Sequence, residues 1–272
     1  MHRQRTRLTK GWLWPVVLLA VVLIAGGIWF GLNQQAQARA QQAASSSRVK
    51  ARSVARSRSV AKASQAEASS RKAEDPVYKD FADEGLSYHQ VQVAKQMPIT
   101  AVGDSVMLGS AYLYKEIFPK VDLDATVSRQ IYQAPELFKS LAASGRLADT
   151  VIIGLGTNGT FTDEAFQSIM TSIGSKRQVY WINVRSDAKW TNEVNRDLVK
   201  MAKRYSNLHI VDWYAASAGH DNWLTADKTH PTTEGQLHYV ATVAKAVLAK
   251  SKYRNKRVRL AKMLALYDDE LC

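Results

Sequence analysis

Three short blocks of polar residues stand out because their side chains could carry out one kind of chemistry together. Gly103-Asp104-Ser105 follows an apolar run, Gly156-Thr157-Asn158 follows another, and Asp227-Lys228-Thr229-His230-Pro231 precedes a helical pattern. A serine hydroxyl is a weak nucleophile until a histidine takes its proton, and a carboxylate commonly orients that histidine. Donors are also needed for the oxyanion that forms. The blocks therefore predict the parts of a serine acyl-transfer site.

The spacing inside the third block suits an acid-base pair. Asp227 and His230 are three residues apart, so the carboxylate can reach one imidazole nitrogen while the other faces a serine from elsewhere in the chain. Pro231 favours an extended backbone at His230 and the start of a helix just beyond.

These blocks resemble the SGNH, or GDSL-like, hydrolases, in which Ser, Gly, Asn and His come from four separate blocks. Within that superfamily the likeness is greatest to the extracellular domains of peptidoglycan O-acetyltransferases. It covers roughly residues 99–250, and the D-x-x-H-P segment is its most specific part. The resemblance implies that Ser105 is the nucleophile, His230 the base, Asp227 its partner and Asn158 an oxyanion donor.

One block departs from the family pattern. The family usually has a glycine whose backbone N–H helps to hold the oxyanion, and the equivalent position here is Ser128, within Thr126-Val127-Ser128-Arg129-Gln130. A serine keeps the backbone donor but not the close approach that glycine permits. We expect an oxyanion hole made by the N–H groups of Ser105 and Ser128 and the side chain of Asn158.

Four further residues are candidates for substrate binding, each with a structural alternative. Arg129 and Gln130 could bind an acceptor or fix their own loop. Trp190 belongs to a Trp and Asn pattern similar to one in the acetyltransferases, and could border the acceptor groove or pack on the sheet. Trp223 follows His220 and Asp221 in a loop that could line the site or be solvated.

The sequence does not predict a metal or cofactor site. No set of His, Cys, Asp and Glu has convincing metal spacing, and the resemblance implies a serine mechanism without a metal. Cys272 is the one cysteine of the 272 residues, so no internal disulfide is expected.

The segment Gly11 to Leu32 predicts a membrane anchor. It is 22 residues long without a charge, and a helix of that length spans roughly 33 Å. The basic residues before it place the N-terminus in the cytoplasm and the remainder outside; they are Arg3, Arg5, Arg7 and Lys10. A cleaved signal peptide is the alternative, with A-x-A sites near Ala38, but its apolar region is usually only about 7–15 residues long.

Residues 33–75 predict a disordered basic stalk, because they are rich in Gln, Ala, Ser, Arg and Lys and have almost no branched apolar residues. Residues 1–75 hold 13 Lys and Arg against three Asp and Glu, so they carry +10 of the chain's net +13. The basic character thus belongs to the anchor and stalk. No binding motif accompanies it, so a nucleic-acid partner is not expected.

The predicted organisation is a cytoplasmic N-terminus (1–10), a transmembrane helix (11–32), the stalk (33–75), a catalytic domain (76–250) and a basic tail (251–272). Apolar runs alternate with helical patterns in the catalytic domain, which predicts an α/β fold with three layers and a parallel sheet. Strands are expected at 99–102, 151–155, 178–184 and 208–213, with a fifth near 121–127, and helices at 107–117, 133–145, 163–173, 190–206 and 232–250. Ligands bind beyond the carboxyl ends of such strands, where Ser105 and Asn158 lie.

The resemblance implies a membrane-anchored serine acetyltransferase outside the cell, acting on cell-wall glycan. A carbohydrate acetyl esterase with the same residues is one alternative, and a non-catalytic wall-binding module is another. The resembling acetyltransferases carry a many-helix membrane domain that passes acetyl groups outward, whereas one span is predicted here. A separate multispanning partner, a longer parent chain or a different reaction would account for that difference.

Overall fold

The computed structural model describes residues 13–249, which divide into two units between Arg71 and Lys72. The predicted N-terminus (1–10), the first two residues of the predicted anchor and the predicted tail (251–272) lie outside the described residues.

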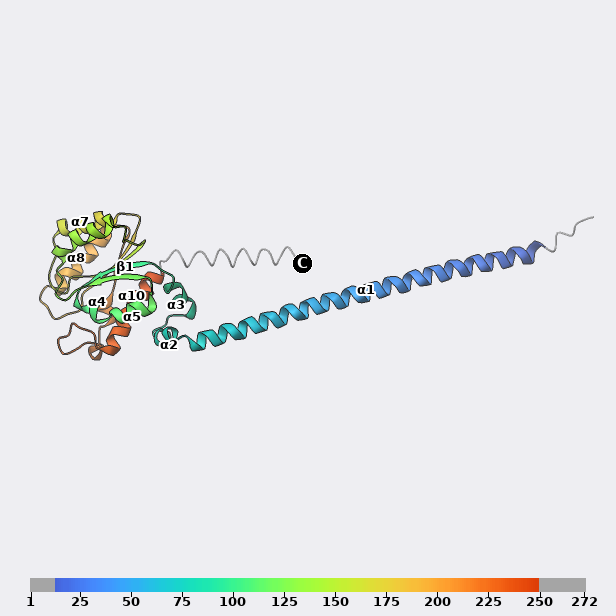
Figure 1. The fold of residues 1–272 in the computed structure, drawn as a ribbon, viewed down its shortest axis with the longest axis horizontal. Coiled ribbons are helices and arrows are strands. Elements are labelled where there is room, and N and C mark those ends of the chain that lie inside the picture. Colours follow the sequence, from blue (N-terminus) through green and yellow to red (C-terminus); the bar gives the residue numbers. More distant parts are fainter. Residues whose placement is uncertain (1–12, 250–272) are drawn as a thin grey trace, which may run out of the picture. The chain divides into compact units, whose positions relative to one another are not determined.

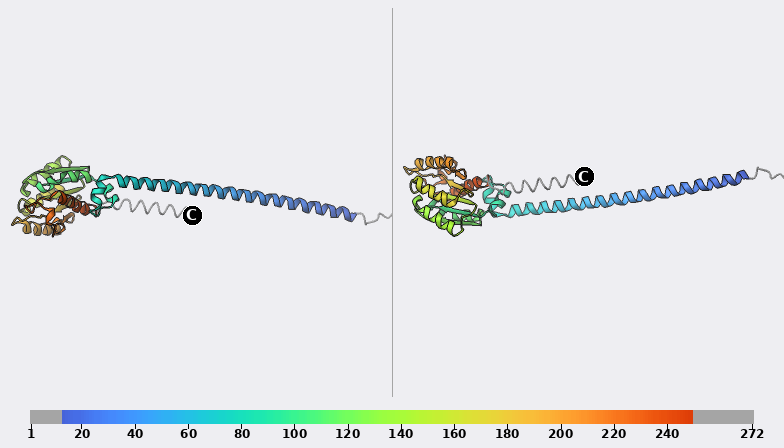
Figure 2. Two further views of the ribbon diagram at one scale, coloured as in Figure 1. Left: turned by 90° about the horizontal axis from the view of Figure 1, so that it is seen from below. Right: turned by 90° about the horizontal axis from the view of Figure 1, so that it is seen from above.

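The described part of the first unit belongs to α1 (Leu13–Glu74), which passes the division at Arg71 by three residues and runs without a break in both views of Figure 2. Among the described residues it is the one helix long and apolar enough to cross a membrane. Residues 33–74 are therefore helical, which differs from the disordered stalk that we predicted. No glycine or proline interrupts this stretch, and its Ala, Gln, Arg and Lys residues are strong helix formers.

The second unit is built on five parallel strands in the order β2-β1-β3-β4-β5. The predicted parallel sheet, including its fifth strand, is confirmed. The strands are β1 (Ile99–Gly103), β2 (Val121–Ala125), β3 (Thr150–Gly154), β4 (Gln178–Ile182) and β5 (Leu208–Val211).

Successive residues of the inner strands enter two different cores, because side chains alternate between the faces of a sheet. Ile152 and Tyr180 join one cluster of buried residues, while Ile153 and Trp181 join the other. Figure 1 shows α4, α5 and α10 on one side of β1 and α7 and α8 on the other. This arrangement is the three-layer fold that the sequence predicts.

The helices agree with the predicted segments except at three places. One is α9 (Trp213–Ala216), which lies where no helix was predicted and begins at a residue that was expected to end the last strand. The predicted helix 107–117 is divided at Ser110 into α4 and α5, and α2 and α3 form in a region without a predicted element. Asp75 and Ser87 cap α2 and α3 through their side chains. The helices are α2 (Pro76–Ala82), α3 (Tyr88–Ala94), α4 (Ser105–Gly109), α5 (Ala111–Ile117), α6 (Ala134–Ala143), α7 (Asp163–Ile173), α8 (Thr191–Arg204), α9 (Trp213–Ala216) and α10 (Thr233–Ala249), with 3-10 turns η1 (Ile131–Gln133) and η2 (Asp221–Trp223).

The contact of α10 with η2 gives a test of this packing. A Cβ at Gly235 would overlap the carbonyl oxygen of Trp223, whereas one at Gly109 would find its nearest neighbour 3.8 Å away. We expect Gly235→Ala to lower the free energy of unfolding by about 1–3 kcal/mol, as overpacking does. Gly109→Ala should leave it within about 0.5 kcal/mol. Denaturant unfolding of the second unit measures both, and equal effects would contradict the packing described.

Candidate active site

Ser105 lies at the carboxyl edge of the sheet, where β1 ends and α4 begins. The residue before it, Asp104, is fully buried and is held on two sides. Its Oδ1 accepts a hydrogen bond from the Val106 N–H (3.0 Å), and its own N–H donates to the Gly154 carbonyl at the end of β3 (3.1 Å). These contacts fix the turn that presents Ser105.

The structure brings Ser105, His230 and Asp227 together in one hydrogen-bonded row. The Ser105 Oγ lies 2.9 Å from the His230 Nε2, and the His230 Nδ1 lies 2.7 Å from the Asp227 Oδ2. With Nδ1 protonated, the ring donates to the carboxylate and its Nε2 can accept the serine proton. This is the geometry that a general base needs.

Local donors surround the other oxygen of the Asp227 carboxylate. Its Oδ1 accepts hydrogen bonds from the Thr225 hydroxyl (2.7 Å), the Thr229 N–H (2.9 Å) and the His230 N–H (3.0 Å). Slight burial raises the pKa of Asp227, but hydrogen bonds from these three residues hold that pKa well below its usual value. Asp227 is therefore an anion throughout the physiological pH range.

The segment carrying this pair is a short closed loop. Leu224 and Pro231 form an antiparallel bridge, and the Thr225 N–H donates to the His230 carbonyl (2.8 Å). Lys228, at its tip, has a φ of +57°, which the tight turn requires. The hydrogen bonds of this loop therefore hold Asp227 and His230 in place independently of their contact with Ser105.

The two predicted oxyanion residues outside Ser105 lie on neighbouring loops. Ser128 follows β2 and has a φ of +60°, a conformation that glycine adopts more readily. Among the described residues, no hydrogen bond uses its backbone N–H. Asn158 follows β3, and its Nδ2 donates to the Arg129 carbonyl on the Ser128 loop (3.4 Å).

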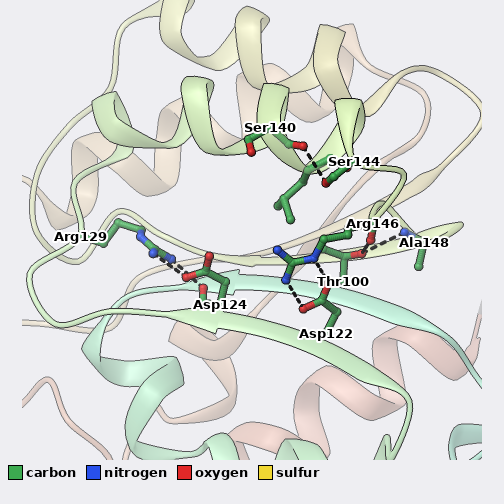
Figure 3. A network of polar contacts seen from close by, with 9 residues as sticks. Thr100, Asp122, Asp124, Arg129, Ser140, Ser144, Arg146 and Ala148 are labelled. Atoms are coloured by element: carbon green, nitrogen blue, oxygen red, sulfur yellow. Dashed lines mark hydrogen bonds and ion pairs between the residues drawn. The ribbon is translucent and has the colours of Figure 1, made fainter.

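Arg129 and Gln130 contact their own surroundings within the protein. The Arg129 guanidinium binds the ends of β1 and β2, as Figure 3 shows for its pair with Asp124. The Gln130 N–H donates to the Gln133 Oε1 (2.8 Å) at η1, and the Gln130 side chain lies against Gly159. Of the two alternatives in the sequence, these contacts favour fixing the loop.

The two predicted tryptophans support different parts of the site. The Trp190 Nε1 donates to the Thr157 carbonyl (3.1 Å), directly before Asn158. Trp223 lies between two imidazole rings, with centroids 3.8 Å from His220 and 3.7 Å from His238. It directly precedes the loop of Asp227 and His230, and its carbonyl accepts a hydrogen bond from the Thr232 N–H (2.8 Å) just beyond that loop.

Sequence reasoning missed a small polar pocket beside the nucleophile. It is lined in part by Asp104, Val106, Arg185 and Trp213. The Asp104 Oδ2, the Arg185 Nε and the Trp213 Nε1 are buried there without a hydrogen-bond partner among the described residues. Arg185 follows the end of β4, so the rule that ligands bind beyond strand ends could have found it. No pattern in the sequence indicates that Asp104 is buried.

No group of three or more His, Cys, Asp and Glu side chains in residues 13–249 could hold a metal ion.

The buried Asp104 gives a pH-dependent prediction. Burial raises the pKa of Asp104 to about 6 from 3.8, whereas the Val106 hydrogen bond, the contacts of Thr157 and the charge of His230 act to lower it. Between these values the folded protein holds a proton that the unfolded chain has lost, so the free energy of unfolding falls as pH rises through this range. Asp104→Asn keeps the side-chain oxygen that accepts the hydrogen bond from the Val106 N–H. It removes the titrating group and therefore this loss of stability at higher pH.

We therefore expect the stability of Asp104→Asn, relative to the unchanged protein, to rise by about 2 kcal/mol between pH 4 and pH 7. Denaturant unfolding at several pH values measures the difference. Parallel pH dependence of the two proteins would show that Asp104 titrates normally.

Comparison with known proteins finds sequence relatives among O-acetyltransferases. No family model matches the chain. It is 32% identical over 139 residues to the O-acetyltransferase OatA of Staphylococcus aureus strain NCTC 8325, covering 51% of this chain and 23% of OatA. It is 33% identical over 149 residues to YrhL of Bacillus subtilis strain 168, a protein named as a candidate peptidoglycan O-acetyltransferase, covering 55% of this chain and 23% of YrhL. The chain thus spans about a quarter of the length of these relatives.

A solved structure shares the fold of the second unit. It is the C-terminal catalytic domain of peptidoglycan O-acetyltransferase A from Streptococcus pneumoniae, with a TM-score of 0.52 and 18% identity, covering 56% of this chain and 93% of that domain. The chain therefore has the SGNH-type α/β fold, and its sequence resembles that of peptidoglycan O-acetyltransferases.

Proposed function

We propose that this chain is a membrane-anchored serine acyltransferase that moves acetyl groups to cell-wall glycan outside the cell. The observation that carries the proposal is the row of Ser105, His230 and Asp227, joined by contacts of 2.9 and 2.7 Å. The similarity to OatA, named as an O-acetyltransferase, supports acetyl as the group transferred.

The reaction follows from this geometry in two steps. The Ser105 Oγ attacks the acetyl carbonyl carbon while the His230 Nε2 takes the serine proton, and the leaving group departs with that proton. A sugar hydroxyl then attacks the acetyl-enzyme and gives its proton to His230, which passes it to the Ser105 Oγ as the sugar ester leaves. In each step the Ser105 and Ser128 N–H groups and the Asn158 amide stabilise the oxyanion.

The position outside the cell rests on the N-terminal part of the chain. The apolar first part of α1 would form the anchor, and the basic residues before it would remain on the cytoplasmic side. An acetyl donor would then be needed outside. We propose that a separate multispanning membrane protein supplies it, unless this chain is part of a longer protein that does so.

Hydrolysis is the second candidate function, because the base is open to water. The side chains of His230 and Asp227 are 43% and 51% exposed. If water replaced the sugar hydroxyl in the second step, the same residues would make the protein a carbohydrate acetyl esterase. Which acceptor reacts depends on how well the glycan occupies the site and excludes water.

The acceptor can be tested with the full chain in detergent micelles, an activated acetyl ester and wall-type glycan oligomers. We expect mass spectrometry to find acetylated glycan with the unchanged protein and none with Ser105→Ala. Ester loss that depends on Ser105 but leaves the glycan unmodified would establish the esterase. Equal turnover by Ser105→Ala would refute both.

The role of the carboxylate can be tested separately. Asp227→Asn keeps the shape of the side chain but removes the charge that stabilises the His230 imidazolium. We expect the rate of acyl transfer to fall by up to about 10⁴-fold, as in serine protease triads. Steady-state kinetics measures this, with Asp122→Asn as the control, because the Asp122 carboxylate on β2 binds Arg146 and does not contact the row.

A further inference from the structure

The turn that holds Ser128 has a backbone conformation that its sequence does not favour. The Arg129 N–H donates to the Thr126 carbonyl (3.3 Å), so Ser128 occupies the third position of a four-residue turn with a φ of +60°. That position favours glycine, and another residue there costs about 1–2 kcal/mol. Such a conformation persists only where the surrounding structure fixes it.

The Arg129 side chain supplies fixed contacts on this turn. Its Nη1 donates to the carbonyls of Gly103 (3.1 Å) and Asp124 (2.6 Å), and its Nη2 donates to the Asp124 carboxylate (2.6 Å) and the Thr126 hydroxyl (3.1 Å). The side chain is only 13% exposed. A planar guanidinium can make this set of contacts at once, whereas an ammonium cannot.

These contacts connect the separate parts of the proposed oxyanion site. Gly103 is the last residue of β1, two positions before Ser105, and Asp124 lies on the adjacent strand β2. The Arg129 carbonyl also accepts the hydrogen bond from the Asn158 Nδ2. Arg129 is therefore bonded to the loop of each proposed oxyanion donor.

We propose that Arg129 is a positioning residue, whose guanidinium holds the Ser128 turn so that the Ser128 N–H and the Asn158 amide face the oxyanion formed on Ser105. The assignment rests on the proposed function of Ser105. It also explains how serine serves where the family has glycine: the contacts of Arg129 hold the turn in a conformation that glycine would adopt unaided.

A second arginine, Arg146, offers a matched control because it also binds an aspartate of β2. Arg146 binds the Asp122 carboxylate through its Nε (2.8 Å) and Nη2 (2.6 Å), and Figure 3 shows this pair beside that of Arg129 and Asp124. Asp122 lies two residues before Asp124 on β2. The Arg146 loop is tied to Thr100 near the start of β1, away from Ser105.

The test compares Arg129→Lys with Arg146→Lys in the full chain in detergent micelles. Each variant keeps the positive charge but loses the planar guanidinium, which makes several hydrogen bonds at once. A displaced oxyanion donor costs about 10²-fold, so we expect Arg129→Lys to lower kcat for acetyl ester turnover by about 10²-fold with KM within about threefold. Arg146→Lys should change kcat by less than threefold, and similar melting temperatures would exclude general unfolding as the cause.

A double variant separates positioning from a general structural effect. If Arg129 acts by holding the Ser128 turn, Arg129→Lys should cost much less in a Ser128→Gly background than in the unchanged protein, because glycine adopts the turn without the guanidinium. Fully additive losses would overturn the assignment, as would equal losses in Arg129→Lys and Arg146→Lys. A raised KM with unchanged kcat would instead indicate that Arg129 binds substrate.

Two readouts remain if the unchanged protein shows no turnover that depends on Ser105. That result would refute the proposed function. The positioning of Arg129 would then be judged by hydrogen exchange of the Thr126–Gln130 backbone and by the rate at which a fluorophosphonate labels Ser105. Faster exchange and slower labelling in Arg129→Lys than in Arg146→Lys support the inference, and no difference overturns it.

Discussion

The parallel pairing of β1 with β2 on one side and β3 on the other is the constraint on which the candidate site depends. Gly103 is paired with Ala125 of β2 and with Gly154 of β3, so the three strands end in register at one edge. Backbone hydrogen bonds continue the pairing beyond the strands, from the Thr126 N–H to Gly103 and from the Asp104 N–H to Gly154. The loops that carry Ser105, Ser128 and Asn158 leave the sheet at this edge as a result.

Two aspartates near the nucleophile have opposite environments. Asp104 is buried with one oxygen unpartnered, and burial raises its pKa, whereas Asp227 is half exposed with local donors that lower its pKa. Environments that separate the pKa values of neighbouring acids commonly separate their roles. The carboxylate that orients His230 is that of Asp227, because its Oδ2 lies 2.7 Å from the His230 Nδ1, although Asp104 is adjacent to Ser105 in sequence.

The sheet and the row of Ser105, His230 and Asp227 could be predicted because local patterns carry them. Apolar runs indicate the strands, and the spacing of Asp227 and His230 places both on one loop. The capped helices α2 and α3 are only seven residues each, too short for a clear period. Residues 33–74 of α1 have a composition typical of disordered segments, yet many of these residues have high helix propensity. Composition alone therefore does not decide between a disordered stalk and a helix.

The partners of Arg129 and the burial of Asp104 could not be read from the sequence for a different reason. They depend on which segments become neighbours once the sheet forms, and no local spacing reports this. Gly103 is 26 residues from Arg129, and Asn158 is 29 residues from it. The sequence left Arg129 with two roles, and only its three-dimensional neighbours distinguish them.

The distance along the chain between Ser105 and His230 also bears on how the chain matures. The two residues are 125 positions apart, whereas Asp227 and His230 are separated by three. During synthesis, which proceeds from the N-terminus, Ser105 emerges long before His230, the base of the proposed mechanism. A nascent or truncated chain can therefore have its serine in place and remain inert. On the proposed mechanism, reactivity arises only when the loop of Asp227 and His230 has docked beside Ser105.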